Sequence, residues 1–514
     1  LYNGGIGTYI KASTETHADA RDRANDGLRV DGCDLNVRVV GEGGNLGCTQ
    51  RGRIEFARKG GLICTDAIDN SAGVDCSDHE VNIKILLGSV IQSGDMTLKQ
   101  RNDLLAEMTD EVGQLVLRNN YLQTEILAVN RANAMNMLNA QQRMIGHLEK
   151  TGELNRQIEF LPSDDEINER RLAKCGLTTP EVAVLLAYSK ISLDKALLAS
   201  DLPDDTDFTP VLVDYFPHPL QTRFGEAMKS HHLRREIIAN QLANRVVNRM
   251  GATFVFRMQE ETNLPADVIC RAFWAADQIF GAETVWREIE ALDNVVPADL
   301  QVELMVELRT LVERAVRWLL RNRKGHAGVA EAVALYQDAA RTLLASLPEL
   351  VPSHLYTRAA ARQLAWIEDS VPERLAMMLA RLEYVPAFFD VTELSRKTGI
   401  ELEVAARAYY TLGRELDLDW LAQAITRLPR DNRWQSLART ALRDDLYRLH
   451  SDLATAALGC PTCDAADYVT PWLAERDAAL AAVRQTLAEL RGYAQLDLAM
   501  LSAGMREIAN QLMN

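Results

Sequence analysis

Polar groups that could orient a small ligand are concentrated between Asp66 and Lys84, in the stretch DAIDNSAGVDCSDHEVNIK. Within it, Asn70 and Ser77 lie on either side of the small residues Ala72 and Gly73. Small residues let a flat ring or a small acid approach the backbone, while amide and hydroxyl groups at fixed offsets orient it. The stretch therefore predicts a cofactor or substrate site beside the start of a helix.

A structural role for the same residues is the alternative interpretation. Ser77 could cap a helix running from about Ser77 to Ser93, with Glu80 completing a capping box. The two interpretations are compatible, because the N-terminus of a helix also favours a bound carboxylate.

The same stretch does not predict a metal site. Its potential ligands occupy nearly consecutive positions and would point in different directions around a helix: Asp75, Cys76, Asp78, His79 and Glu80. A lone CxxC motif, Cys460 to Cys463, lacks the second pair of ligands that a zinc site of this kind needs. We therefore expect no metal.

A glycine-rich loop, GEGGNLG at Gly41 to Gly47, precedes this stretch. It follows Leu35 to Val40, whose apolar character predicts a buried parallel strand, and it precedes a helix that Thr49 would cap. This context is that of a dinucleotide-binding turn, but the glycine spacing differs and Leu46 stands where the third glycine belongs. On spacing alone, a glycine-rich turn without phosphate contact is equally compatible.

The elements that position these residues have α/β character up to about residue 95, including a helix expected from Ser13 or Thr14 to Asp26. Beyond Met96 the strand signals almost disappear and helical patterns follow one another. The clearest helix start is Thr178-Thr179-Pro180-Glu181, a capping box with proline in the first turn. We expect a mainly α protein: a truncated Rossmann-like α/β domain at 1–95, followed by a large all-α domain with subdomains at 96–350 and 351–514.

Composition and net charge indicate which kinds of partner are disfavoured and which cellular compartment to expect. A net charge of −16 over 514 residues argues against nucleic acid or an anionic membrane as the main partner. Eight cysteines in so long a chain do not predict a disulfide framework. No signal peptide or membrane span is evident, so we expect a cytoplasmic protein. The chain starts with Leu1, and its first residues look like the end of a strand, so we expect a fragment; a processed terminus is the alternative.

Several long motifs together resemble the large bacterial NAD-dependent glutamate dehydrogenases. They are LYNGGIGTY at the start, VVGEGGNLGCTQ and DAIDNSAGVDCSDHEVNIKI. TTPEVAVLLAYSK (178–190) and LRREIIANQLANRVVNRMGATFVFR (233–257) are similar to the helical C-terminal region of that family. The resemblance implies NAD as cofactor, L-glutamate and 2-oxoglutarate as substrate and product, and a homo-oligomer. It implies that the catalytic lysine and aspartate lie before Leu1, so that no catalytic residue is assigned here and the fragment alone would be inactive and bind NAD poorly.

The resemblance also implies roles for individual residues. Asn45 and Asn70 would face the nicotinamide-ribose end of NAD, and Ser77 the side-chain carboxylate of glutamate. The remaining cofactor-binding candidates are the neighbouring Gly43 and Gly44, with Asn3, Gly4 and Gly5 at the end of a central strand. Asp78, His79 and Glu80 receive no role. Two other functions stay open: a non-enzymatic helical interaction or regulatory scaffold, and a dehydrogenase for another amino acid.

Overall fold

The computed structural model describes residues 1–322, 328–351, 353–430, 432–460 and 467–513. Contacts divide the chain into two compact units, Leu1–Phe273 and Trp274–Asn514. The division into 1–95, 96–350 and 351–514 stays a prediction. The CxxC motif extends outside the described residues.

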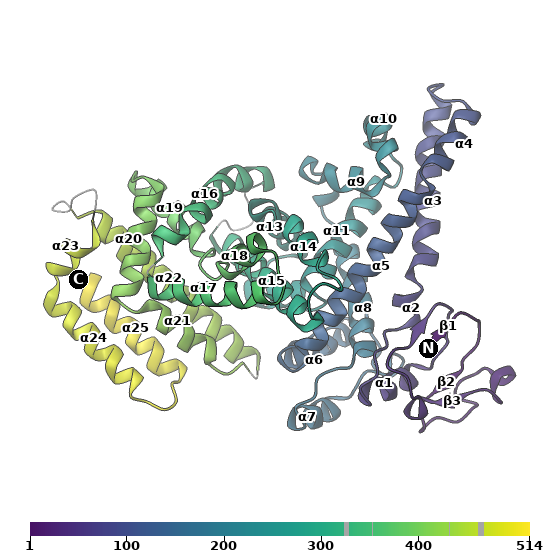
Figure 1. Ribbon diagram of the computed structural model, residues 1–514, viewed down its shortest axis with the longest axis horizontal. Coiled ribbons are helices and arrows are strands. Elements are labelled where there is room, and N and C mark those ends of the chain that lie inside the picture. Colours follow the sequence, from purple (N-terminus) through teal and green to yellow (C-terminus); the bar gives the residue numbers. More distant parts are fainter. Residues whose placement is uncertain (323–327, 352, 431, 461–466, 514) are drawn as a thin grey trace. The chain divides into compact units, whose positions relative to one another are not determined.

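The strands of the first unit form two small parallel sheets (Figure 1). In one, β1 (Tyr2–Asn3) pairs with β4 (Gly41–Glu42); in the other, β2 (Ile10–Lys11) pairs with β3 (Val30–Asp31). A small apolar core beneath them consists of Ile10, Val40, Cys48, Phe56 and Ile63. The mainly α character is confirmed, whereas a complete Rossmann-like sheet is not formed by the described residues.

Two predicted elements of this region are wrong. In the described chain, the expected strand at 35–40 is reduced to a bridge between Val39 and Leu62, because a parallel strand requires paired neighbours along its length. The expected helix at 13–26 is reduced to the short 3₁₀ helix η1 (Arg23–Asn25). Side chains hold that segment as a loop, since Asp22 accepts a bond from the Thr8 N–H at 2.8 Å and the Arg29 Nε donates to the Thr8 carbonyl at 2.8 Å.

Most of the rest of the first unit is helical; α5 packs against α3, α8 and α11, and α8 packs against α11. The leucines Leu87, Leu127, Leu185 and Leu242, one from each of these helices, are fully buried. The bounds of the helices are α1 (Gln50–Arg58), α2 (Asp66–Asp69), α3 (Ser71–Gln92), α4 (Leu98–Glu107), α5 (Thr109–Ala132), α6 (Ala134–Lys150), α7 (Asp164–Leu172), α8 (Thr179–Leu198), α9 (Thr209–Tyr215), α10 (His218–Met228), α11 (Arg234–Met250) and α12 (Phe254–Thr262). The next helix, α13 (Ala266–Phe280), begins in the first unit and ends in the second.

The start of α8 confirms the predicted capping box. The Thr178 N–H donates to the Glu181 carboxylate at 2.7 Å, and Glu181 lies at the third helical position. Glu181 is buried and also accepts two bonds of 2.7 Å from the Arg170 guanidinium on α7. The capping-box residue Glu181 therefore also joins α8 to α7.

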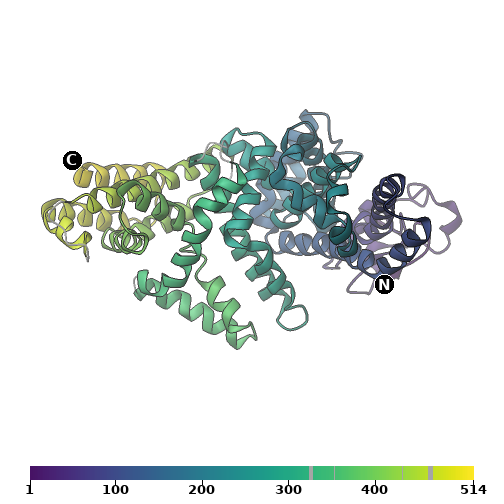
Figure 2. The ribbon, with the colours of Figure 1, turned by 90° about the horizontal axis from the view of Figure 1, so that it is seen from above.

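Helices joined by turns and short loops make up most of the described residues of the second unit (Figure 2). The α20 helix packs against α16, α19 and α22, and α24 packs against α25. The bounds are α14 (Ala282–Glu290), α15 (Ala298–Asn322), α16 (Val329–Leu350), α17 (Ser353–Glu368), α18 (Glu373–Ala380), α19 (Ala387–Thr398), α20 (Leu402–Glu415), α21 (Leu418–Arg427), α22 (Arg433–Leu458), α23 (Val469–Ala474), α24 (Asp477–Arg491) and α25 (Leu498–Met513). None of the described helices in either unit is both long and apolar enough to cross a membrane.

Candidate functional site

Strand pairing brings the two glycine-containing candidate segments together. Because Tyr2 pairs with Gly41 and Asn3 with Glu42, the residues that follow each strand lie side by side. The Gly44 N–H donates to the Asn3 carbonyl at 3.0 Å. A Cβ at Gly44 would lie 2.5 Å from the Gly5 carbonyl oxygen, so the close approach of the two loops requires glycine here.

A buried ion pair holds the 41–47 loop. Glu42 is fully buried, and its two carboxylate oxygens accept bonds from Arg53 Nε and Nη2 at 2.7 and 2.8 Å. The Cys48 N–H donates to the same carboxylate at 3.0 Å. Arg53 also contacts Asp66 at 3.0 Å, and Asp66 accepts a bond from the Leu46 N–H at 2.8 Å. No local sequence pattern indicates this role of Glu42 and Arg53, because their pairing depends on how α1 packs beneath the loop.

Asp69 connects the loop to α2. Its carboxylate accepts a bond from the Glu42 N–H at 2.9 Å. Burial raises the pKa of Asp69 to about 6, although the hydrogen bond from Glu42 acts in the opposite direction. The loop and the start of the following helix are thus joined by a carboxyl group that titrates in the weakly acidic range.

The amides of Asn45 and Asn70 are in direct contact. Asn70 Nδ2 donates to Asn45 Oδ1 at 2.6 Å, although the two residues are 25 positions apart in the sequence. Asn120 on α5 supports this corner, because its Nδ2 donates to the Ile68 carbonyl at 2.8 Å and to Ser71 Oγ at 3.0 Å. The structure therefore places the two predicted nicotinamide-side residues at one corner between the loop and α3.

Ser77 lies on α3, two turns after Asn70. Its Oγ is exposed and lies 3.5 Å from the Gly73 carbonyl oxygen. Residues 70, 73 and 77 share one side of the helix, and a Cβ at Gly73 would lie 3.3 Å from Asn70 Oδ1. Because Gly73 has no side chain, no side chain fills the surface of α3 between the Asn70 amide and the Ser77 hydroxyl group.

The alternative role of Ser77 as a helix cap is wrong. The chain becomes helical at Ser71, so that Asn70 is the N-cap residue and Ser77 belongs to the second turn. Glu80 forms an ion pair with Lys84 on the surface instead of reaching back to Ser77.

The corner offers neutral polar groups and small residues to a ligand. Asn3 Nδ2 is buried and has no hydrogen-bond partner among the described residues. Gly4, Gly5 and Asn45 are exposed, while Gly43 and Gly44 are half-buried beside them. Amide groups suit the carboxamide and ribose hydroxyls of a nucleotide, and glycines admit a ring close to the backbone. These residues therefore fit the nicotinamide-ribose end of a dinucleotide.

Behind the exposed side of α3 lies a buried polar cluster. His79 is buried, its ring stacks on Tyr215 with centroids 4.4 Å apart, and its Nε2 lies 3.7 Å from Asp75 Oδ1. Asn119 Nδ2 donates to Asp75 Oδ2 at 2.8 Å. His79 thus packs inside the first unit. This is a structural role that the sequence did not indicate.

Lys190 on α8 belongs to the same region. Its Nζ donates to Gln123 Oε1 at 3.0 Å, and burial lowers its pKa to about 7, with the Asp75 charge opposing that shift. A lysine at the end of the TTPEVAVLLAYSK motif carries no sequence signal for burial, because lysine is usually exposed. Among the described residues, no group of three or more His, Cys, Asp or Glu side chains is placed to hold a metal ion.

Comparisons with known proteins match nearly the whole chain. A family model described as the catalytic domain of bacterial NAD-glutamate dehydrogenase matches residues 1–130, and one described as glutamate dehydrogenase, C-terminal, matches residues 174–510. The NAD-specific glutamate dehydrogenase of Pseudomonas aeruginosa is 46% identical over 512 residues, which cover 99% of this chain and 32% of that protein.

Two further relatives give the same relationship. The NAD-specific glutamate dehydrogenase of Halomonas elongata is 40% identical over 512 residues, covering 99% of this chain and 32% of that protein. That of Mycobacterium tuberculosis is 40% identical over 511 residues, covering 99% and 31%. The chain thus spans about a third of the length of the curated relatives it matches.

Proposed function

This chain belongs to the family of bacterial NAD-dependent glutamate dehydrogenases, and we propose that it forms one wall of the cleft in which such an enzyme oxidises L-glutamate. The observation that carries the proposal is the 2.6 Å bond between Asn70 Nδ2 and Asn45 Oδ1 at an open corner. Ser77 lies on the same side of α3, so cofactor-side and substrate-side groups share one surface.

The proposed reaction converts L-glutamate, NAD⁺ and water into 2-oxoglutarate, ammonium, NADH and a proton. NAD, when bound, accepts the hydride that leaves the α-carbon of glutamate. The residual iminium group is then hydrolysed by water to the keto acid and ammonium. The contribution of this wall is to align the two reactants at near-attack distance and to exclude solvent.

Each residue of the wall has a distinct proposed contact. The Asn45–Asn70 pair orients the carboxamide and ribose of the cofactor, with the unpartnered Asn3 Nδ2 as an additional donor. Gly4, Gly5, Gly43 and Gly44 let the cofactor approach the backbone. Ser77 Oγ donates a hydrogen bond to the side-chain carboxylate of glutamate.

The wider setting is also proposed. The small parallel sheets would belong to a Rossmann-like NAD-binding domain, and the whole protein would be a cytoplasmic homo-oligomer. The helical residues 96–350 and 351–514 would serve assembly or regulation.

The test compares asparagine variants of the whole protein. Asn70→Ala and Asn45→Ala should each raise the KM for NAD by about tenfold, since one lost hydrogen bond contributes about 1 kcal/mol or more. The matched control is Asn102→Ala, which removes an exposed amide on α4 that accepts bonds from Arg101. An unchanged KM in both corner variants would remove this corner from the cofactor site.

The alternative functions predict other outcomes of the same assays. If the whole protein neither binds NAD nor forms NADH from glutamate, the scaffold function replaces the proposal. If another amino acid is oxidised with a higher kcat/KM than glutamate, the protein is a dehydrogenase for that amino acid.

A further inference from the structure

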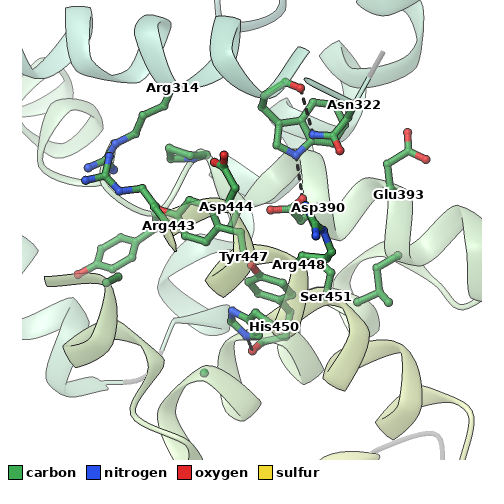
Figure 3. Close-up of a pocket in the computed structure, with 18 of the residues that line it drawn as sticks. Arg314, Asn322, Asp390, Glu393, Arg443, Asp444, Tyr447, Arg448, His450 and Ser451 are labelled. Carbon is green, nitrogen blue, oxygen red and sulfur yellow. Dashed lines mark hydrogen bonds between the residues drawn. The ribbon is translucent and has the colours of Figure 1, made fainter. Parts of the chain in front are cut away.

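The second unit contains a large cavity among its helices. It has a volume of about 1110 Å³ and is lined by α15, α16, α19, α20, α21 and α22, with Arg358 from α17 and residues before α19 (Figure 3). Ligand pockets in proteins usually measure about 300–1,000 Å³. The cavity therefore has room for an organic molecule with several functional groups.

The charge of the cavity lining is opposite to that of the chain. Nine arginine and lysine side chains line it, against six aspartate and glutamate side chains. In the whole chain, 72 acidic residues outnumber 56 basic ones. A local surplus of cations in an acidic protein creates a positive potential that favours anions.

Most of the lining carboxylates already have donors. Asp444 pairs with Arg321 and Glu383 with Arg358. Glu393 accepts a bond from Arg396 at 3.1 Å, and Asp390 accepts one from Trp318 Nε1 at 2.8 Å (Figure 3). These pairs neutralise part of the lining. Two further lining arginines pair with carboxylates outside it, Arg317 with Glu313 and Arg448 with Asp445. The cations left for a ligand are therefore those without such a partner.

Three lining cations have no such partner. Arg314 on α15, Lys397 on α19 and Arg427 on α21 form no hydrogen bond or ion pair with any described residue. Figure 3 shows Arg314 extending toward Arg443 of α22 on one side of the cavity. Arg443 already donates to Thr426 Oγ1 at 3.3 Å. The Arg314 guanidinium is available for charge-assisted hydrogen bonds to an oxyanion.

Aromatic rings form much of the remaining wall. Five of the 13 tyrosines of the chain line the cavity: Tyr336, Tyr384, Tyr409, Tyr410 and Tyr447. The Tyr409 ring stacks on His450 at a centroid distance of 3.6 Å, and Tyr410 Oη donates to the Tyr384 carbonyl at 3.0 Å. Such rings are rigid and present both an apolar face and a polar tip, which suits the carbon skeleton of an organic anion.

We propose that this cavity is a binding site for an organic oxyanion, held through its phosphate or carboxylate groups by Arg314, Lys397 and Arg427. The site is separate from the corner around Asn45 and Asn70, since all of its residues belong to the second unit. The proposal does not depend on the dehydrogenase function, because it follows from the charge, pairing and volume of this cavity.

The test titrates this chain by calorimetry with two probes, pyrophosphate as the phosphate source and citrate as the carboxylate source. At least one should bind with a Kd below about 1 mM, and the tighter probe identifies the preferred group. Arg314→Gln and Lys397→Gln should each weaken that binding by about tenfold, as expected for the loss of one charge-assisted hydrogen bond. Neither side chain has a partner among the residues that the structure describes, so neither change should lower the melting temperature appreciably.

Arg341→Gln is the matched control, because Arg341 is exposed on α16, pairs with Asp338 and does not line the cavity. Its affinity for both probes should equal that of the unaltered chain. Asn70→Ala should also leave the affinity unchanged, which separates this site from the proposed cofactor corner. The proposal is overturned if neither probe binds below about 1 mM, or if Arg314→Gln and Lys397→Gln bind as tightly as the control.

Discussion

The Arg53 guanidinium donates to both carboxylate oxygens of Glu42, at 2.7 and 2.8 Å, beneath the glycine-rich loop that contains Asn45. Glu42 is fully buried, and 7% of the Arg53 side chain is exposed. A bidentate pair in such surroundings sets the position of the backbone on both sides of it. The local shape of the proposed cofactor corner therefore depends on a residue of α1 that is not among the proposed ligand contacts.

Removing Arg53 should destabilise the first unit strongly. Arg53→Met leaves the Glu42 carboxylate buried without its cation, which costs about 3–5 kcal/mol for pairs of this kind. Urea unfolding followed by circular dichroism measures the change. Arg58→Met, at the exposed end of the same helix, should shift the free energy of unfolding by no more than about 0.5 kcal/mol. Equal stability of the two variants would contradict the importance of this ion pair.

Substrate recognition is tested at Ser77. If its Oγ donates to the side-chain carboxylate of glutamate, Ser77→Ala in the whole protein should raise the KM for glutamate by about tenfold or more, since a hydrogen bond to a charged group contributes about 1.5–3 kcal/mol. The KM for NAD should change little. Ser230→Ala, which removes an exposed hydroxyl after α10, serves as the control. An unchanged KM for glutamate would exclude Ser77 from the substrate site.

Lys190 should make the stability of the first unit depend on pH. Burial lowers its pKa from 10.5 to about 7, so between these values the unfolded chain binds a proton that the folded chain does not. The cost of burying this group is therefore complete below pH 7 and disappears as the pH rises toward 10.5. Lys190→Met should stabilise the unit by on the order of 2 kcal/mol at pH 6, and by less at pH 9.

Thermal unfolding at several pH values measures this effect. Lys195→Met, an exposed position on the same helix, should change the melting temperature equally little at every pH. A stabilisation by Lys190→Met that stays constant from pH 6 to pH 10 would show that apolar packing, not the buried charge, is responsible.

The capping box of α8 should contribute measurably to stability. Thr178→Ala removes the side chain that bonds to Glu181 at 2.7 Å, and loss of an N-cap costs about 1 kcal/mol. Thr179→Ala, within the first turn, leaves the cap intact and should cost less. The free energies of unfolding of the two variants in urea provide the comparison, and equal values would assign no role to the cap.

Local patterns in the sequence were sufficient where the physical cause is local. The capping box at Thr178 and Glu181 spans one helical turn, so residue types at fixed spacing predict it directly. The change to helices after Met96 is likewise a matter of short-range periodicity. The resemblance of the long motifs indicates the family, and the same motifs contain the asparagines and Ser77.

The remaining features depend on contacts between segments that are far apart in the chain. The predicted helix at 13–26 is absent because Asp22 and Arg29 bond to the backbone of Thr8. The pairing of Asn45 with Asn70, the burial of Glu42 with Arg53 and the near-neutral lysine at position 190 arise only when separate elements pack together. The arginine-lined cavity combines residues from Arg314 to Thr455. No short-range sequence pattern predicts it, because its basic residues come together only when separate helices pack.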